Sequence, residues 1–121
     1  MALVLCTGIN AVLLDTRRMI LESAGHKVIT VTSEPELRSA CQNLVFDVAV
    51  IGQTVSTRMK RRILLMIREQ CPEVKVLELY EPHTGRVLDD ADSSLLVPAD
   101  IPKDLADRVT ELAGNKSTTP D

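Results

Sequence analysis

Four short segments of this 121-residue chain hold the residues that could do chemistry. Each follows an apolar run typical of a buried strand, and the segments are Thr7 to Asn10, Gly52-Gln53, Tyr80-Glu81 and Val97-Pro98. In a parallel α/β sheet, ligands and reacting groups lie outside the carboxyl ends of the strands. The first segment could hold an anion with backbone N–H groups. It lacks the second and third glycines of a dinucleotide-binding loop, however, which favours a simple turn.

The histidines and cysteines do not form a metal-binding or redox motif. His26 and His83 are far apart in the sequence and have no Cys or acid at metal-ligand spacing, so we interpret them as surface residues. Cys6, Cys41 and Cys71 lack the paired spacing of zinc or redox sites and fall within or beside apolar stretches, which indicates buried thiols. Nucleophile, base and stabilising group do not converge anywhere, so we predict no enzymatic activity, metal or cofactor.

The strongest local charge asymmetry is a cluster of cations at Arg58, Lys60, Arg61, Arg62 and Arg68. On a helix these positions occupy much of the face opposite Met59, Ile63 and Met66, which is typical of a solvated outer face. The alternative is an electropositive surface that binds an acidic partner or a phosphate backbone. The net charge of −3 does not indicate such a partner, and an aromatic content of 2% disfavours stacking on nucleic-acid bases.

Size and composition predict one globular domain. Apolar residues make up 45% of the chain and charged residues 26%, the ordinary balance of a soluble protein. The segment 1–6 has no basic leader, and its apolar run is too short for a secretory signal or a membrane span. We therefore expect a cytoplasmic protein, with a domain over 1–114 and a disordered polar tail over 115–121.

Strand and helix patterns alternate along the chain. The strands are predicted at 3–6, 26–32, 46–51, 74–80 and 94–97, and the helices at 10–24, from 33, at 56–70 and from 100. Each crossover must be right-handed, so the prediction is one doubly wound, five-stranded parallel sheet of order 2-1-3-4-5. The connection 81–93 is too short and too broken for a full helix. The basic pair Arg17-Arg18, on the first helix, is expected on the other side of the sheet from the cation cluster.

From 3 to 112 the chain resembles the response-regulator receiver domains of two-component signalling. The best-matched stretches are MILESAGHKV at 19–28 and FDVAVI at 46–51. The resemblance implies a flavodoxin-like fold and a phosphorylation site. That site has two acids after the first strand that hold Mg²⁺, an aspartate after the third strand, a hydroxyl after the fourth and Lys-Pro after the fifth.

This chain departs from that pattern at nearly every position. The resemblance assigns Gly8 and Ile9 to the acidic pair, Gly52 to the phosphoacceptor, Tyr80 to the hydroxyl and Val97 to the lysine, with Pro98 kept. Phosphoryl transfer requires a nucleophile, a divalent cation and a group that holds the phosphate oxygens. All three are replaced here, so the chain resembles an atypical pseudo-receiver.

Our leading hypothesis is a signalling module that binds a protein partner, or a second copy of itself, independently of phosphorylation. The resemblance implies a binding face at the fifth strand and last helix, which would include Ser94, Leu96, Lys103 and Asp107. One alternative is nucleic-acid or polyanion binding through the basic helix 58–68. Another is a small-ligand sensor at the strand ends, which would use backbone groups at Gly8 and Gly52.

Overall fold

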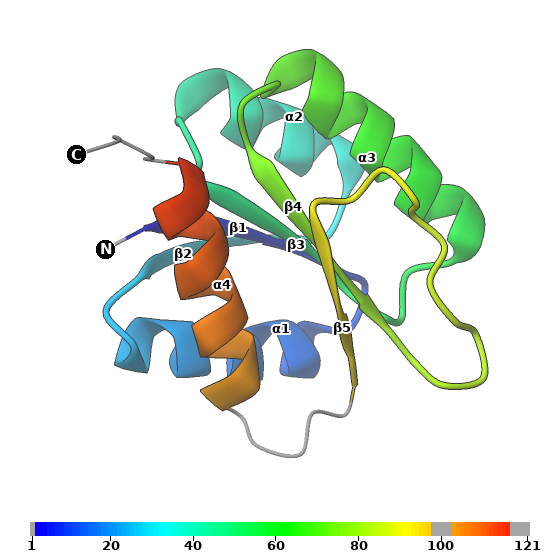
Figure 1. Ribbon diagram of the computed structural model, residues 1–121. Helices are drawn as coiled ribbons and strands as arrows, with labels where there is room; N and C mark the ends of the chain where they lie inside the picture. Colours follow the sequence, from blue (N-terminus) through cyan, green and yellow to red (C-terminus); the bar gives the residue numbers. More distant parts are fainter. Residues whose placement is uncertain (1, 98–102, 117–121) are drawn as a thin grey trace.

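The computed structural model describes residues 2–97 and 103–116. Strands and helices alternate along it as far as β4 (Figure 1). The strands are β1 (Leu3–Thr7), β2 (Lys27–Val31), β3 (Val48–Ile51), β4 (Lys75–Tyr80) and β5 (Ser93–Leu96). The helices are α1 (Ala11–Ser23), α2 (Glu34–Asn43), α3 (Thr57–Gln70) and α4 (Lys103–Lys116).

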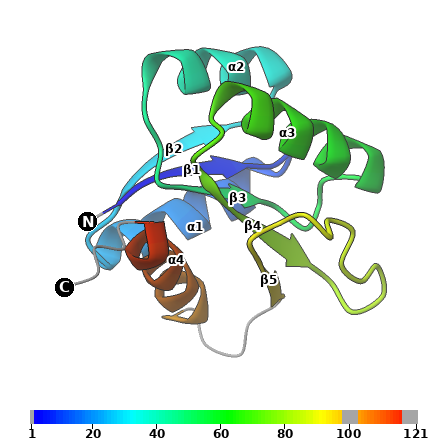
Figure 2. The same ribbon diagram turned by 45° about the horizontal axis from the view of Figure 1, so that its top comes forward.

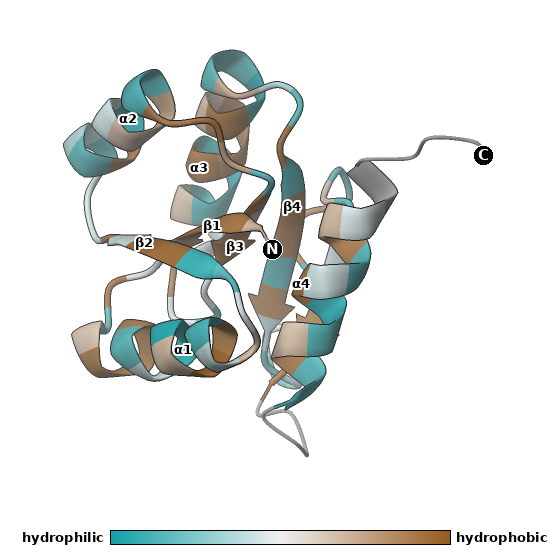
Figure 3. Ribbon diagram, turned by 90° about the vertical axis from the view of Figure 1, so that its left-hand side faces the viewer, coloured by the Kyte–Doolittle hydropathy of each residue, from teal (hydrophilic) through white to brown (hydrophobic). Residues whose placement is uncertain are grey.

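The strands form one parallel sheet in the order β2-β1-β3-β4-β5, which confirms the predicted topology. Helices α1 and α4 cover one face, and α2 and α3 cover the other (Figures 1 and 2). Each face has its own apolar cluster: Val50 and Leu79 belong to the α1/α4 side, and Ala49 and Ile51 to the α2/α3 side. Strand β4 is buried along most of its length and lies between the layers (Figure 3).

Three helices begin where polar side chains satisfy their first N–H groups. The side chain of Asn10 accepts from the backbone N–H of Val12 and Leu13 at the start of α1. Ser33 and Ser56 cap α2 and α3 in the same way. All three stand at positions where the sequence predicts a helix to begin, because short polar side chains stabilise exposed helix N-termini. Helix α4 continues to Lys116, past the expected domain end at 114, and 117–121 lie outside the described residues.

The connection from β4 to β5 contains turns and no helix, as predicted. It runs alongside α3 (Figure 2) and is fixed by hydrogen bonds to Arg68 of α3 and to Glu78 of β4. Arg68 of α3 donates to the Asp90 carbonyl at 2.7 Å and to the Asp92 carboxylate at 3.2 Å. Leu88 is buried in the apolar cluster on the α2/α3 side. The connection therefore covers part of the sheet face where a further helix would otherwise pack.

A buried ion pair joins α3, β4 and this connection. Lys60 is 2% exposed and donates from Nζ to Glu78 Oε2 at 2.9 Å and to the Leu79 carbonyl at 2.8 Å. The Glu78 carboxylate also accepts from the backbone N–H groups of Val87 at 2.8 Å and Leu88 at 2.9 Å. The prediction that Lys60 lies on a solvated outer face is therefore wrong. It lies three residues before Ile63, and this helical spacing turns it toward the sheet.

His26 is also buried, at 7% exposed, which corrects its interpretation as a surface histidine. Its Nδ1 accepts from the Ala2 backbone N–H at 3.1 Å, so the neutral ring holds its proton on Nε2. That nitrogen lies 2.9 Å from Thr110 Oγ1, which donates to the Ala106 carbonyl. The ring thus ties the start of β1 to α4. His83, by contrast, is exposed as expected.

The cysteine interpretation is confirmed for Cys6 and Cys41, which are buried free thiols, whereas Cys71 is half-buried. Burial raises the pKa of Cys41 to about 12, and the neighbouring Cys71 contributes to the same shift. In the described ranges, no helix is both long and apolar enough to span a lipid bilayer.

Breaking the buried ion pair is expected to cost stability. Lys60→Met strands the Glu78 carboxylate without its cation, and Glu78→Gln strands the ammonium. Each change should lower the free energy of unfolding by about 3–5 kcal/mol. The double variant should lose less than the sum, because it leaves neither a carboxylate nor an ammonium buried without its partner. Urea denaturation measures all three, and Arg61→Met, on the exposed face of α3, should leave the midpoint unchanged.

His26 should make stability depend on pH. Burial is the main cause that lowers its pKa below the ordinary 6.5, and the carboxylate of Asp47 opposes the shift weakly. Below about pH 6.5 the unfolded chain therefore binds a proton that the folded chain does not. The free energy of unfolding should fall as pH decreases through that value, and level off below the folded-state pKa. Denaturation from pH 8 to 5 should show this slope in the wild type and in His83→Gln, and a smaller slope in His26→Gln.

Candidate functional site

The carboxyl ends of β1 and β3 meet at two glycines. Thr7 pairs with Ile51 across the two strands, so Gly8 and Gly52 follow at the same edge of the sheet. The Gly52 N–H donates to the Thr7 carbonyl at 3.0 Å. A Cβ placed on Gly52 would stand 3.0 Å from that oxygen and 3.7 Å from the Gly8 Cα. The position that the resemblance assigns to a phosphoacceptor therefore has no side chain, and no free space for one.

The guanidinium of Arg17 lies over Gly52. Its Nη1 is 3.1 Å from the point where a Gly52 Cβ would stand, and its Nη2 donates to the side-chain oxygen of Gln53. Arg17 is 8% exposed, a burial that the sequence analysis did not predict for this member of the basic pair. It follows Leu14 by three residues and precedes Leu21 by four, a spacing that directs it toward the sheet. Arg18 does lie on the surface, where it pairs with Asp15 and Glu22.

Burial shapes the electrostatics beneath this guanidinium. Burial raises the pKa of the Cys6 thiol to about 12, and the positive charge of Arg17 opposes this only in part. Burial also lowers the pKa of Arg17, but an arginine stays charged at neutral pH. The strand ends therefore hold a fixed positive charge above a protonated, unreactive thiol.

The other positions assigned by the resemblance do not converge on Gly52. Ile9 is 69% exposed and lies on the α2/α3 side. Tyr80 ends β4, where it is half-buried opposite Leu96, and its carbonyl accepts from the Val97 N–H at 2.8 Å. Val97 is buried in the apolar cluster of the α1/α4 side. Pro98 lies outside the described residues.

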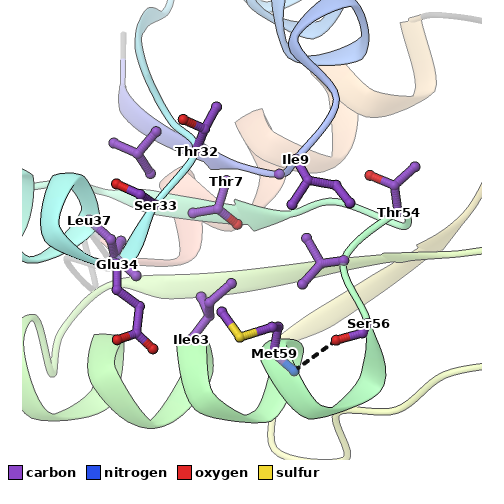
Figure 4. Close-up of a pocket in the computed structure, with 13 residues that line it drawn as sticks. Thr7, Ile9, Thr32, Ser33, Glu34, Leu37, Thr54, Ser56, Met59 and Ile63 are labelled. Carbon is purple, nitrogen blue, oxygen red and sulfur yellow. Dashed lines mark hydrogen bonds between the residues drawn. The ribbon is translucent and has the colours of Figure 1, made fainter.

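A pocket of about 200 Å³ opens beside Gly8, between the strand ends and helices α2 and α3 (Figure 4). We call it the tip pocket. Its apolar lining side chains come from the strand ends, from the loops that follow them and from both helices, and they are Ile9, Val31, Leu37, Val55, Met59 and Ile63. Gly8 lines it but Gly52 does not, because Arg17 covers Gly52. The open space that the small-ligand alternative expects at Gly8 and Gly52 is therefore present at Gly8 alone of these two, and side chains form its walls.

The basic cluster on α3 is largely neutralised. Lys60 is buried against Glu78, and Arg62 pairs with Glu34 at the start of α2. Arg68 pairs with Asp90 and Asp92 of the connection. Among the described residues, Arg58 and Arg61 are the members of the cluster without an ion pair. Two exposed cations on one helix make a much smaller electropositive surface than the sequence indicated.

The residues expected at a partner-binding face border the free edge of the sheet. Ser94 and Leu96 are on the edge strand β5, and the 45% exposed Leu96 is the larger apolar group. Side chains alternate along a strand, so both face away from Leu95, which packs on the α1/α4 side. Lys103 and Asp107, 4.0 Å apart, lie exposed at the start of α4 on that opposite side. The four residues therefore flank one edge from both faces.

Sequence reasoning did not assign a role to two residues that shape these strand ends and their support: Arg17 and Glu78. A signal for Glu78 was present, because a lone acid inside an otherwise apolar strand requires a buried cation or N–H donors. For Arg17 the signal was its place in a helical row of apolar residues. Within the described ranges, no group of three or more His, Cys, Asp or Glu side chains could hold a metal ion.

The two glycines should respond differently to the same substitution. In Gly52→Ala the new Cβ meets the Thr7 carbonyl and the Arg17 guanidinium, and relieving this overlap should cost about 1–3 kcal/mol of unfolding free energy. In the matched control, Gly8→Ala, the Cβ meets Leu14 at an ordinary 3.4 Å. Thermal denaturation should therefore show a clear loss for the first variant and little change for the second. Equal losses would contradict the close approach at Gly52.

Comparison with known proteins adds information on the fold. No protein-family model and no curated protein matches the sequence. Solved structures do match. A response regulator receiver domain protein from Clostridium thermocellum has a TM-score of 0.79 at 22% identity, covering 96% of this chain and 97% of that one.

Two further structures agree. A CheY-like receiver domain protein from Methanospirillum hungatei has a TM-score of 0.74 at 18% identity, with 96% of each chain covered. Chemotaxis response regulator CheY4 of Vibrio cholerae has a TM-score of 0.76 at 20% identity, covering 93% of this chain and 98% of that chain. The chain therefore has the response-regulator receiver fold.

Proposed function

We propose that this chain is a receiver-like signalling module that acts without aspartyl phosphorylation and without catalysis, by binding a protein partner. The observation that carries the proposal is the Arg17 guanidinium packed over Gly52 and bonded to Gln53. A receiver of the active type needs a carboxylate nucleophile and a bound divalent cation at these strand ends. Here the nucleophile position is a glycine, and a side chain of the protein itself occupies the space beside it.

Charge supports the same conclusion. Arg17 brings a permanent positive charge to the strand ends, and a cation there opposes the binding of a divalent metal ion. The acids that would offset it are replaced by Gly8 and Ile9. The site therefore lacks the electrostatic conditions for phosphoryl transfer as well as the nucleophile.

The free edge of β5 supports the binding part of the proposal. Leu96 exposes an apolar side chain on an edge strand, and Lys103 and Asp107 supply charges on the neighbouring helix. An apolar centre with a charged rim is the usual composition of a protein-binding surface. As the edge strand of the described sheet, β5 also offers backbone groups to a partner strand, apart from the Ser94 carbonyl, which accepts from Arg108.

The alternative of nucleic-acid or polyanion binding has less support. It relied on five cations on one exposed helix face, of which Lys60 is buried and two others are ion-paired. Because affinity for a phosphate backbone rises with the number of cations that contact it, Arg58 and Arg61 alone would bind weakly.

Co-purification from the native cell tests the proposal. Tagged wild-type chain is expected to retain a specific protein, and Leu96→Arg should lose most of it by placing a charge at the centre of the surface. Leu65→Arg is the matched control, because Leu65 is also an exposed leucine, 66% exposed on α3 against 45% for Leu96. That variant should retain the partner as well as the wild type does.

A second arm treats the wild type with acetyl phosphate and Mg²⁺. Intact mass spectrometry should show no phosphoryl adduct, and partner recovery should not change. A stable aspartyl phosphate would refute phosphorylation independence. Equal recovery by Leu96→Arg and the wild type would refute the assigned surface.

A further inference from the structure

The tip pocket has the size of a small organic molecule. Its volume is about 200 Å³, whereas an apolar protein cavity of roughly 150 Å³ is large enough to bind benzene. One six-membered ring with a substituent of two or three heavy atoms therefore fills it. A folded peptide segment or a nucleotide does not fit, because each contains several times that number of atoms.

The interior of the pocket favours an apolar ligand body. Val31, Leu37, Val55 and Ile63 are buried residues that form its floor and sides. Figure 4 shows Ile63 and Met59 of α3 beneath Thr7 of β1. The Thr7 hydroxyl donates to the Val50 carbonyl at 3.2 Å, so it is already used within the protein. An apolar group that enters this space exchanges water for carbon contacts on every side.

The mouth of the pocket offers hydrogen-bond donors. Ser33 and Ser56 are the N-caps of α2 and α3, and their oxygens accept from the backbone N–H groups of Glu36 and Met59. Each hydroxyl therefore has its own proton left to donate. Neither proton has an acceptor in the described part of the chain, and the same holds for the hydroxyl of Thr54, which lies on the same side of the pocket as Ser56 (Figure 4). Leftover donors at the mouth match a ligand with an oxygen acceptor.

The charged side chains at the mouth do not favour an ionised ligand. Glu34 is the charged residue of the lining, and its carboxylate pairs with Arg62 outside the pocket. This pair leaves the rim neutral. A ligand carboxylate would lose hydration and gain no free cation, whereas an uncharged carbonyl loses much less.

We propose that the tip pocket is a binding site for a small uncharged organic molecule, with an apolar body of about one ring and a single carbonyl or ester oxygen. This site goes beyond the proposed partner-binding function and does not depend on it. It lies between α2 and α3, whereas the surface at Ser94, Leu96, Lys103 and Asp107 lies at the β5 edge. Binding at one can therefore be tested while the other is intact.

The probe is acetophenone, which has one ring and one carbonyl. Backbone amide shifts of the full chain in two-dimensional NMR spectra should change saturably, with the largest changes at 31–37 and 54–63. The dissociation constant should be below about 1 mM, which is within reach of so small a ligand. Ethylbenzene, which keeps the ring and lacks the carbonyl, should bind several-fold more weakly. Phenylacetate, which is ionised, should bind weakest of the three.

Two variants locate the site. Val55→Phe fills the pocket from a buried position and should weaken acetophenone binding at least about tenfold. Overpacking can unfold a protein, so Ile9→Asp is the second variant. It places a charge on the wall at a position that is 69% exposed, and it should weaken binding at least about fivefold. Leu65→Phe, on the outer face of α3, is the control and should bind as the wild type does.

Three outcomes would overturn the proposal. The first is the absence of saturable shifts up to the solubility limit of acetophenone. The second is equal binding by the wild type, Val55→Phe and Ile9→Asp. The third is a set of shifts centred on the second pocket, of about 180 Å³ between Cys41 and Val74.

Discussion

The hydrogen bonds around Glu78 hold together three segments that are separate in the sequence: β4, α3 and the connection from β4 to β5. A carboxylate in the middle of a buried strand must find donors, because an unpaired charge in the interior costs several kcal/mol. Lys60 supplies one donor from α3, and the backbone N–H groups of Val87 and Leu88 supply two from the connection. Each of these three segments is thereby fixed relative to the other two. The position of the connection, and so the shape of the β5 edge that it borders, depends on this buried carboxylate together with the contacts of Arg68 to Asp90 and Asp92.

Patterns that repeat over many residues allowed the fold to be predicted. Apolar runs marked the strands, Asn10, Ser33 and Ser56 marked helix starts, and the alternation of the two elements indicated a doubly wound sheet, for which the order 2-1-3-4-5 was predicted. The missing helix before β5 was also predictable from Pro82 and Gly85 in a short segment. These features depend on backbone propensity and on solvent exclusion, which act locally and are readable from residue type.

The errors concern side chains whose environment depends on distant partners. The burial of Arg17 was not predicted, and Lys60 and His26 were interpreted as exposed, because charged and polar residues usually are. Arg17 contacts Gly52 and Gln53, Lys60 contacts Glu78, and His26 contacts Ala2 and Thr110. All of these partners are far away in the sequence. Helical spacing turned Arg17 and Lys60 inward. Knowing what they would meet there required the register of strands that the sequence does not specify residue by residue.

The connection between β4 and β5 is fixed to Glu78 through main-chain N–H groups, and this has a consequence for how the protein can diverge. Every residue except proline supplies such a group. Exposed positions in the loop, such as Arg86 and Asp89, can therefore change identity without loosening its attachment. The attachment to Glu78 does not depend on the side chains of the connection, so its exposed side chains are free to vary. Selection could retune the contacts beside β5 for a new partner, one substitution at a time, on an unchanged scaffold.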